Sequence, residues 1–170
     1  EIIKLKIDQG LFVDDKIINR LIEDILKNKD NHNRLIFDGY PRNLNQAKDL
    51  QNLMKKYNQS LSGVLCLKVK EEDIIKRILG RQTCTKCGLI FNSFSNPATK
   101  QNHKCDSSFL QKRTDDNEST IRNRFTTYTK ETLPILNYYQ NQKLLYEIDG
   151  MRDISVIFQE IRHIIGTLEG

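Results

Sequence analysis

A short segment that ends in arginine has the residue types needed to hold a phosphate group and a hydrated metal ion. Asp38, Gly39 and Arg42 follow the apolar run 35–37, which we predict to be a buried strand. Ligands of parallel α/β sheets bind at the carboxyl ends of strands. A carboxylate there can orient hydrated Mg²⁺, a glycine admits close approach of a ligand, and a guanidinium suits phosphate. A tight turn with a surface arginine explains the same residues, so the segment alone leaves both interpretations open.

Arginines recur downstream, at Arg77, Arg81, Arg113 and Arg124. Arg77 and Arg81 are four residues apart, so we predict that they share one face of a helix. Several guanidinium groups that converge on one cleft would neutralise a polyphosphate and stabilise charge during phosphoryl transfer. Taken singly, each arginine is more simply explained as a solvated surface residue.

Three cysteines follow the pattern of a zinc-binding module. Cys84 and Cys87 have the spacing of a zinc knuckle, and Cys105 supplies a third thiolate. A complete tetrahedral site then needs His103, Asp106 or another oxygen donor. We predict a structural zinc; a metal-free remnant and a redox pair are the alternatives. Catalytic zinc is not expected, because nothing nearby resembles a general base beside an open site.

The remaining cysteine, Cys66, lies in the apolar run 64–67, where we predict an inert core thiol. Nothing in the cysteine pattern suggests a secreted disulfide framework. The compartment expected from the cysteines is therefore a reducing cytoplasm.

Composition is that of an ordinary soluble globular protein, with 38% hydrophobic and 29% charged residues among 170. No apolar run approaches the roughly 18 residues of a membrane span, and no signal peptide opens the chain. The net charge of +5 suits a partner that carries phosphates, or reflects a lysine-rich surface. Nucleic acid is disfavoured because the basic residues are dispersed among acidic ones.

The elements that must position these residues alternate between strands and helices. Apolar spacing predicts strands at 35–37, 63–69 and 144–148, and helices at 14–26, 44–54, 71–79, 121–125 and 154–165, with a short helix opened by Pro134. We expect the strand at 63–69 to be buried. The last helix is expected to bury Ile154, Ile157, Phe158, Ile161, Ile164 and Ile165. The alternation predicts an α/β fold with a parallel sheet.

One stretch breaks this alternation. From residue 82 to residue 112 the helical periodicity disappears, and Cys, Asn, Ser and Pro punctuate the chain. We interpret it as an inserted module. The predicted organisation is a core over residues 1–81, an insert over residues 82–112 and the rest of the core over residues 113–170.

The chain resembles the adenylate kinase family over essentially its whole length, and most specifically the bacterial members with a zinc-bearing lid. The matching segments, in order, are residues 8–13, 35–46, 77–81, 113–124 and 148–152. Residues 35–46, Leu-Ile-Phe-Asp-Gly-Tyr-Pro-Arg-Asn-Leu-Asn-Gln, are very close to the family signature. The resemblance implies a P-loop nucleoside monophosphate kinase fold, a parallel sheet flanked by helices with an inserted zinc-ribbon-like lid.

The resemblance also implies an activity. The reaction is Mg·ATP + AMP ⇌ two ADP, which maintains adenine nucleotide balance and proceeds by direct in-line transfer. ATP, AMP and ADP are the implied partners, Mg²⁺ accompanies ATP, zinc is structural, and the expected protein is a monomer. The AMP site would comprise Leu11, Phe12, Val13, Gly39, Arg42, Gln46, Arg113 and Arg124. Within it, Arg42 would hold the phosphate and Gln46 would read the adenine edge.

Roles at the ATP side follow in the same way. The residues implied there are Arg77, Arg81, Ile90, Phe91 and Arg152. Those implied around the transferring phosphoryl group are Arg81, Arg113 and Arg124, with Asp38 placing Mg²⁺ through water. Asp115 and Asp116 would pair with lid arginines or set the hinge, and no general base is expected.

The chain departs from the family pattern in two places. Family members with a zinc lid carry a Cys or Asp three residues after the third cysteine, where this chain has Ser108. Intact members also begin with a strand and a Gly-x-x-x-x-Gly-Lys loop, and this sequence contains no such motif. We expect the chain, which opens at Glu1, to be a truncated fragment that is inactive and poorly folded without that segment.

Two other functions are compatible with parts of the pattern. A related kinase could act on UMP, CMP or GMP, but such relatives generally have short lids, so the long insert and Gln46 favour AMP. A zinc-ribbon interaction module on a degenerate kinase scaffold is the alternative from a different class. It gains weight only if the native gene lacks the phosphate-binding loop.

Overall fold

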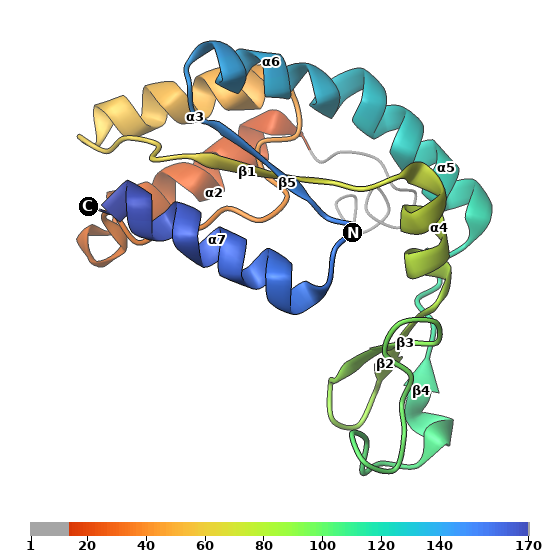
Figure 1. Ribbon diagram of the computed structural model, residues 1–170. Coiled ribbons are helices and arrows are strands. Elements are labelled where there is room, and N and C mark those ends of the chain that lie inside the picture. The colour runs from red at the N-terminus through yellow and green to blue at the C-terminus, as the bar shows by residue number, and fades with distance from the viewer. Residues whose placement is uncertain (1–13, 170) are drawn as a thin grey trace. The chain divides into compact units, whose positions relative to one another are not determined.

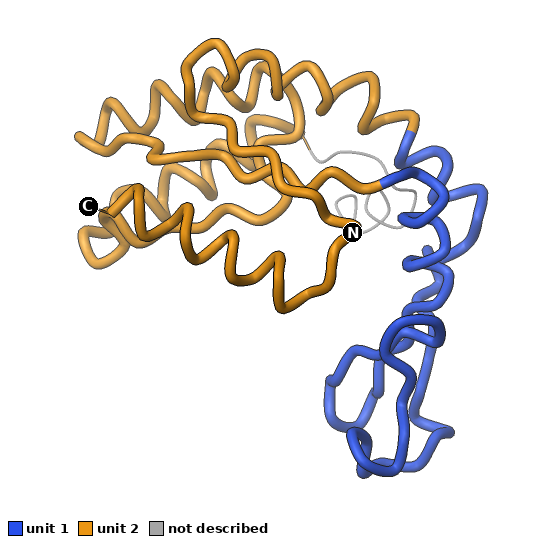
Figure 2. The backbone as a smooth tube through the Cα atoms, viewed as in Figure 1, with its two compact units in different colours: residues 1–12, 70–125 blue, residues 13–69, 126–170 orange. Residues whose placement is uncertain are grey.

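The computed structural model describes residues 14–169 (Figure 1). They fall into two compact units, treated separately below: residues 70–125, and residues 14–69 together with 126–169 (Figure 2). The predicted AMP-site residues Leu11, Phe12 and Val13 lie outside the described residues. Within the described part of the chain, no helix is long and apolar enough to cross a membrane.

The larger unit is built on a parallel pair of strands, as predicted. Strand β1 (Val64–Lys68) pairs with β5 (Leu145–Asp149), with Val64 opposite Leu145. The helices of this unit are α2 (Asp15–Lys27), α3 (Leu44–Lys56), α6 (Leu133–Asn141) and α7 (Ile154–Glu169), with a 3-10 turn at Lys29–Asn31 and a π-helical turn at Tyr128–Thr132. Helices α6 and α7 both contact β5, on opposite sides of the strand pair (Figure 1).

Polar caps and a proline set where these helices begin. Asp14 caps α2 by accepting a 2.8 Å hydrogen bond from the backbone N–H of Lys16. Asn43 caps α3 in the same way, through a 2.8 Å bond from the backbone N–H of Gln46. Pro134 lies in the first turn of α6, where its fixed φ suits the helix and its missing N–H costs nothing.

The core of the larger unit has two clusters, both involving α3. In the first, Ile22 and Leu26 of α2 pack against Leu50 and Met54 of α3. In the second, Ala47 of α3 packs against side chains of α6, chiefly Ile135 and Tyr139. Apolar residues of α3 belong to both clusters, so this helix packs against both α2 and α6.

The predicted strand at 35–37 is wrong. The segment forms no strand and lies in neither sheet, and Ile36 is 87% exposed. A strand requires a neighbour that supplies complementary N–H and C=O groups, and an apolar run cannot reveal whether one is present. Within residues 14–169 no strand pairs with this segment.

Two predictions of burial are also wrong. The strand predicted at 63–69 forms, but Leu67 in it is 51% exposed, so it is not buried. In α7, Ile154 is 81% exposed and Phe158 is 55% exposed, while Ile157 is half-buried, as are the remaining members of the predicted face, Ile161, Ile164 and Ile165. The described parallel sheet has two strands, so it offers a narrow surface for α7 to cover.

The smaller unit contains an antiparallel sheet, which fits the loss of helical periodicity from residue 82. Its strands β2 (Arg81–Cys84), β3 (Ile90–Asn92) and β4 (Leu110–Gln111) lie in the order β3-β2-β4, with a 3-10 turn at Ser107–Phe109 before β4. Helix α4 (Glu71–Leu79) precedes this sheet, and α5 (Glu118–Thr127) follows it. This unit is wider than the predicted insert, whose boundaries at 82 and 112 remain a prediction.

The prediction that Arg77 and Arg81 share a helix face is wrong. Helix α4 ends at Leu79, and Arg81 begins strand β2. Gly80 separates the two elements, and a Cβ atom there would lie 2.5 Å from Cδ2 of Phe94. A glycine is therefore needed where the chain leaves the helix and passes close to that ring.

We expect Leu26→Ala to lower the free energy of unfolding of the larger unit by about 2–5 kcal/mol, because the side chain is fully buried between α2 and α3. Leu21→Ala in the same helix is the matched control. Leu21 is 56% exposed, so its loss should cost less than about 1 kcal/mol. Urea denaturation followed by circular dichroism measures both, and equal losses would contradict the assignment of the core.

Candidate functional site

The loop from Asp38 to Arg42 folds back on itself in the larger unit. The guanidinium Nε of Arg42 donates a 2.6 Å hydrogen bond to the backbone carbonyl of Gly39. Gly39 has a φ of +69°, and a Cβ atom there would lie 3.1 Å from Nη2 of Arg42. Glycine is therefore required twice, for the backbone conformation and for the approach of the arginine. The side chains of Asp38 and Arg42 are both exposed, so both are accessible to a ligand.

Gln46 lies one helical turn further on, in a polar network that joins the starts of α2 and α3. Its Nε2 donates a 2.6 Å hydrogen bond to Oδ1 of Asp15, and its Oε1 accepts a 2.8 Å bond from the backbone N–H of Arg42. Asn43 donates to the same carboxylate at 3.2 Å and 3.3 Å. Sequence reasoning missed Asp15, because no motif distinguishes it from other acidic residues in the first turn of a helix.

The arginine cluster of the smaller unit is held by two buried carboxylates. Arg81 makes two hydrogen bonds to Asp116, at 2.6 Å and 2.9 Å. Arg113 and Arg124 both bind Asp115, the first through two bonds of 2.8 Å and 2.9 Å and the second at 2.6 Å. The acids are 7% and 8% exposed. The structure thus brings together three arginines that the sequence separates, and it agrees with the expectation that these acids pair with arginines.

Charge pairing favours the ionised form of Asp115. Burial alone would raise the pKa of Asp115, but hydrogen bonds from Arg124 and Arg113 outweigh it and hold the pKa below its ordinary value of 3.8. The hydrogen bond to Asp116 raises the pKa of Arg81. A guanidinium carries five N–H donors, so an arginine bound to one carboxylate retains donors for a phosphate.

The remaining residues expected at the ATP side lie in different surroundings. Arg77 is in the last turn of α4, and Ile90 in β3 is 63% exposed. Phe91 is 4% exposed and packs edge-on against His103, with ring centres 4.9 Å apart. Its side chain therefore belongs to the interior of the unit. Arg152, in the larger unit, is paired with Glu160.

The three cysteines predicted to bind a metal lie close together, and the candidate ligand His103 lies with them. The ligand atoms of Cys84, Cys87, His103 and Cys105 all lie within 4.8 Å of one another. Nε2 of His103 is buried without a hydrogen-bond partner among the described residues. Asp106, the other candidate, instead caps the 3-10 turn by accepting a 2.8 Å bond from the N–H of Ser108. Of the candidates left open by the sequence, which were His103, Asp106 or another oxygen donor, the geometry favours His103 as the fourth ligand.

The electrostatics of the thiols fit a divalent cation. Burial opposes ionisation of Cys84, but the His103 ring and backbone N–H groups outweigh it and lower the pKa of this thiol to about 6. Burial and the neighbouring thiols Cys87 and Cys84 raise the pKa of Cys105 to about 11. The thiolate of Cys84 thus opposes ionisation of Cys105 unless a cation lies between them. Three sulfurs and one imidazole form a donor set typical of zinc.

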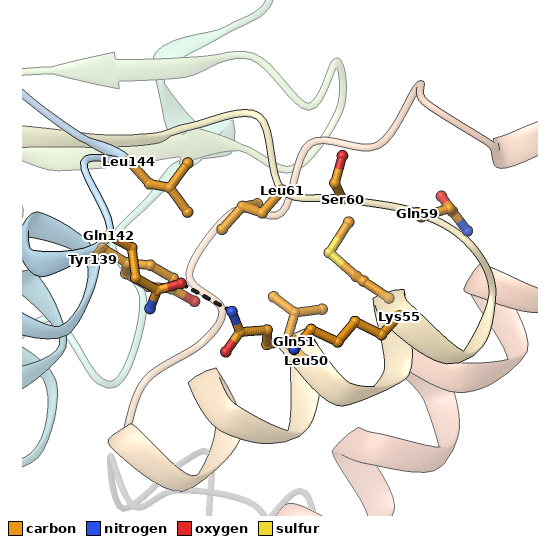
Figure 3. A pocket seen from close by; sticks show the side chains of 10 residues that line it. Leu50, Gln51, Lys55, Gln59, Ser60, Leu61, Tyr139, Gln142 and Leu144 are labelled. Atoms are coloured by element: carbon orange, nitrogen blue, oxygen red, sulfur yellow. Dashed lines mark hydrogen bonds between the residues drawn. The ribbon is translucent and has the colours of Figure 1, made fainter.

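A partly open pocket of about 170 Å³ lies elsewhere in the larger unit (Figure 3). Leu50, Leu61 and Leu144 line its apolar wall, and a 2.9 Å hydrogen bond joins Gln51 to Gln142 beside it. No residue predicted to bind a nucleotide lines this pocket. The pocket is therefore separate from the exposed loop at residues 38–42.

We expect His103→Ala to weaken zinc binding at least about tenfold, because it removes one of four ligands. Asp106→Ala is the matched control, since it removes a neighbouring carboxylate that caps a turn. Competition with a chelator measures affinity, and the absorption spectrum of the cobalt-loaded protein reports the ligand set. An unchanged cobalt spectrum in the His103 variant, or a loss confined to the Asp106 variant, would overturn the ligand assignment.

We expect Asp115→Asn to destabilise the smaller unit by about 1–3 kcal/mol at neutral pH. Since the folded-state pKa of Asp115 is depressed, its contribution is present above the unfolded-state value and is lost as pH falls through the folded-state pKa. The difference between variant and parent should therefore shrink in acid. Glu118→Gln, at an exposed pair with Arg122, should change stability by less than about 1 kcal/mol. A difference that persists at low pH would contradict this origin.

Comparison with known proteins shows the family to which the chain belongs. Residues 1–144 match the family model described as adenylate kinase. The chain is 39% identical over 159 residues to an adenylate kinase of Pelagibacter ubique, covering 94% of this chain and 75% of the relative. It is 40% identical over 164 residues to that of Acholeplasma laidlawii, covering 95% and 74%. An Archaeoglobus fulgidus adenylate kinase is 35% identical over 164 residues, covering 95% and 75%. The chain belongs to the adenylate kinase family.

Proposed function

We propose that this protein transfers a phosphoryl group from Mg·ATP to AMP, reversibly and directly, to give two ADP. The observation that carries the proposal is the set of arginines held at Asp115 and Asp116 in a chain of this family. Three guanidinium groups on two buried acids form a cationic cluster of the kind that phosphoryl transfer needs. Both acids are paired with arginines, so they are not poised as general bases.

AMP binds through the larger unit. Arg42 takes the phosphate, because its guanidinium is exposed and its fork of N–H donors suits phosphate oxygens. Gln46 contacts the base through the part of its amide that Asp15 and the Arg42 N–H leave available. Residues 11–13, which lie outside the described part of the chain, would contribute to the AMP site as the family resemblance implies.

The transferring phosphoryl group is contacted by Arg81, Arg113 and Arg124. Each guanidinium keeps N–H donors beyond those that its carboxylate accepts, and these remaining donors bind the phosphate oxygens. Asp38 orients the Mg²⁺ that accompanies ATP through a water molecule. On the ATP side, Arg77 contacts phosphate, Ile90 contacts the base, and Phe91 and Arg152 contribute through their backbones.

Zinc has a structural role in the smaller unit. The buried hydrophobic residues of the insert include only Cys84 and Phe91 within the described chain, and His103 completes its interior. So small an interior supplies little burial energy, and a metal held by Cys84, Cys87, Cys105 and His103 would replace the missing core. The insert, residues 82–112, would then serve as a stable lid over ATP.

The central experiment measures ADP formation from ATP with AMP, UMP, CMP and GMP in turn. It is run on the chain as printed and on a version extended by an N-terminal strand and Gly-x-x-x-x-Gly-Lys loop. We expect turnover with AMP alone, and only in the extended protein. Folded protein that shows no turnover with any acceptor in either form would refute the proposal.

In the active form, we expect Arg42→Ala to raise the KM for AMP at least about tenfold, because it removes a charge-assisted phosphate contact. The KM for ATP should change little. Arg34→Ala is the matched control, since it removes an exposed arginine from the preceding segment of the same unit. Steady-state kinetics with each nucleotide varied would separate the two, and equal effects of both variants would contradict the role of Arg42.

A further inference from the structure

We propose that Asp15 fixes the side-chain amide of Gln46 in one orientation and thereby selects a 6-aminopurine over a 6-oxopurine as the acceptor base. The inference rests on the proposed function, in which Gln46 contacts the base of the monophosphate. It assigns a specificity role to Asp15, at the start of α2. This residue belongs neither to the family signature nor to the arginine cluster.

The first step is the chemistry of the two contacts to the amide. An ionised carboxylate only accepts hydrogen bonds, and a backbone N–H only donates them. Nε2 of Gln46 faces Oδ1 of Asp15 at 2.6 Å, and its Oε1 faces the N–H of Arg42 at 2.8 Å. Rotation of the amide by half a turn would place oxygen against carboxylate and NH₂ against N–H. Both bonds would be lost and replaced by repulsive contacts.

The second step is the rigidity of the network around this pair. Asn43 accepts the backbone N–H of Gln46 at 2.8 Å and donates to both oxygens of Asp15 at 3.3 Å and 3.2 Å. Asn43 therefore caps α3 and also orients the carboxylate of Asp15. The arrangement is a variant of the capping box, with Asn43 as the cap and Gln46 three residues later. Gln46 is 3% exposed, so water offers little compensation for a rotated amide.

The third step is what the fixed amide offers a base. An amide has two N–H donors and two acceptor lone pairs, and the protein occupies one of each. One N–H and one lone pair remain, in a fixed order. Adenine presents an amino donor beside the N1 acceptor, which matches one order of these groups. Hypoxanthine and guanine present a carbonyl acceptor beside an N1–H donor, which matches only the reversed order. A site whose polar groups are left unpaired rejects the wrong ligand strongly.

The test compares AMP with IMP, which differ at this edge and share the ribose and phosphate. Asp15→Asn preserves shape but replaces the acceptor-only group with one that can donate or accept. Only the Arg42 N–H then opposes rotation of the Gln46 amide, so the rotated orientation becomes less costly. In the protein extended by the phosphate-binding loop, we expect the AMP-to-IMP ratio of kcat/KM to fall about tenfold or more, chiefly through the KM values. Calorimetric binding of the two nucleotides should show the same loss of selectivity without requiring turnover.

Asp14→Asn is the matched control. Asp14 is the neighbouring carboxylate, it caps α2 through Lys16, and asparagine also caps helices well, so the AMP-to-IMP ratio should be unchanged. A purely structural role of Asp15 would weaken AMP and IMP equally and leave the ratio unchanged, which would overturn the inference. Failure of the unaltered protein to bind AMP would instead refute the proposed function, and this inference with it. Selective AMP binding that survives in Asp15→Asn would refute the inference alone.

Discussion

The pairing of arginine with buried carboxylate is the interaction on which the rest of the site depends. Arg113 and Arg124 share one acid, Asp115, and Arg81 is held by its neighbour Asp116. Three like charges placed close together would repel one another, and long side chains would lose entropy when ordered. The two acids offset both costs before any substrate binds. In the proposed function, phosphate oxygens would then meet donors that are already oriented, as electrostatic stabilisation of the charge that develops during a reaction requires.

Two other groups of polar side chains are also held in place by their protein neighbours. In the smaller unit, the Cys84, Cys87, His103 and Cys105 group gathers donors that a metal can neutralise, in a segment with little apolar interior. In the larger unit, Asp15 and neighbouring groups hold the amide that the proposal assigns to the base. Local hydrogen bonds and charges, more than large apolar surfaces, set the geometry of each functional group.

The sequence predicted the elements more reliably than their surroundings. Helical spacing located the helices, and the alternation of elements predicted the parallel pairing of β1 with β5. The strand predicted at 35–37 failed, because strand pairing depends on a neighbour and not on the segment itself. The buried face predicted for α7 failed for Ile154 and Phe158, because burial depends on the width of the sheet beneath the helix. Gly80 separates Arg77 from Arg81, and spacing alone could not show that a helix ends there.

The sequence also predicted some site residues better than others. Residues within a motif, such as Cys84 and Cys87, could be identified from spacing. His103 could be named only as one of several candidates, since the chain had to fold before an unpartnered nitrogen could be distinguished from the capping role of Asp106. Asp15 could not be found at all, because it acts on Gln46 across 31 positions of sequence.

The central claim is direct transfer of a phosphoryl group to AMP, and a single-turnover experiment with terminally labelled ATP tests it most directly. ATP labelled in its γ-phosphate is mixed with AMP and excess enzyme that carries the phosphate-binding loop. The account predicts that the label passes to the β-phosphate of the ADP formed from AMP, with no labelled protein at any time. Label released as inorganic phosphate, or retained on the protein before it reaches AMP, would contradict the account.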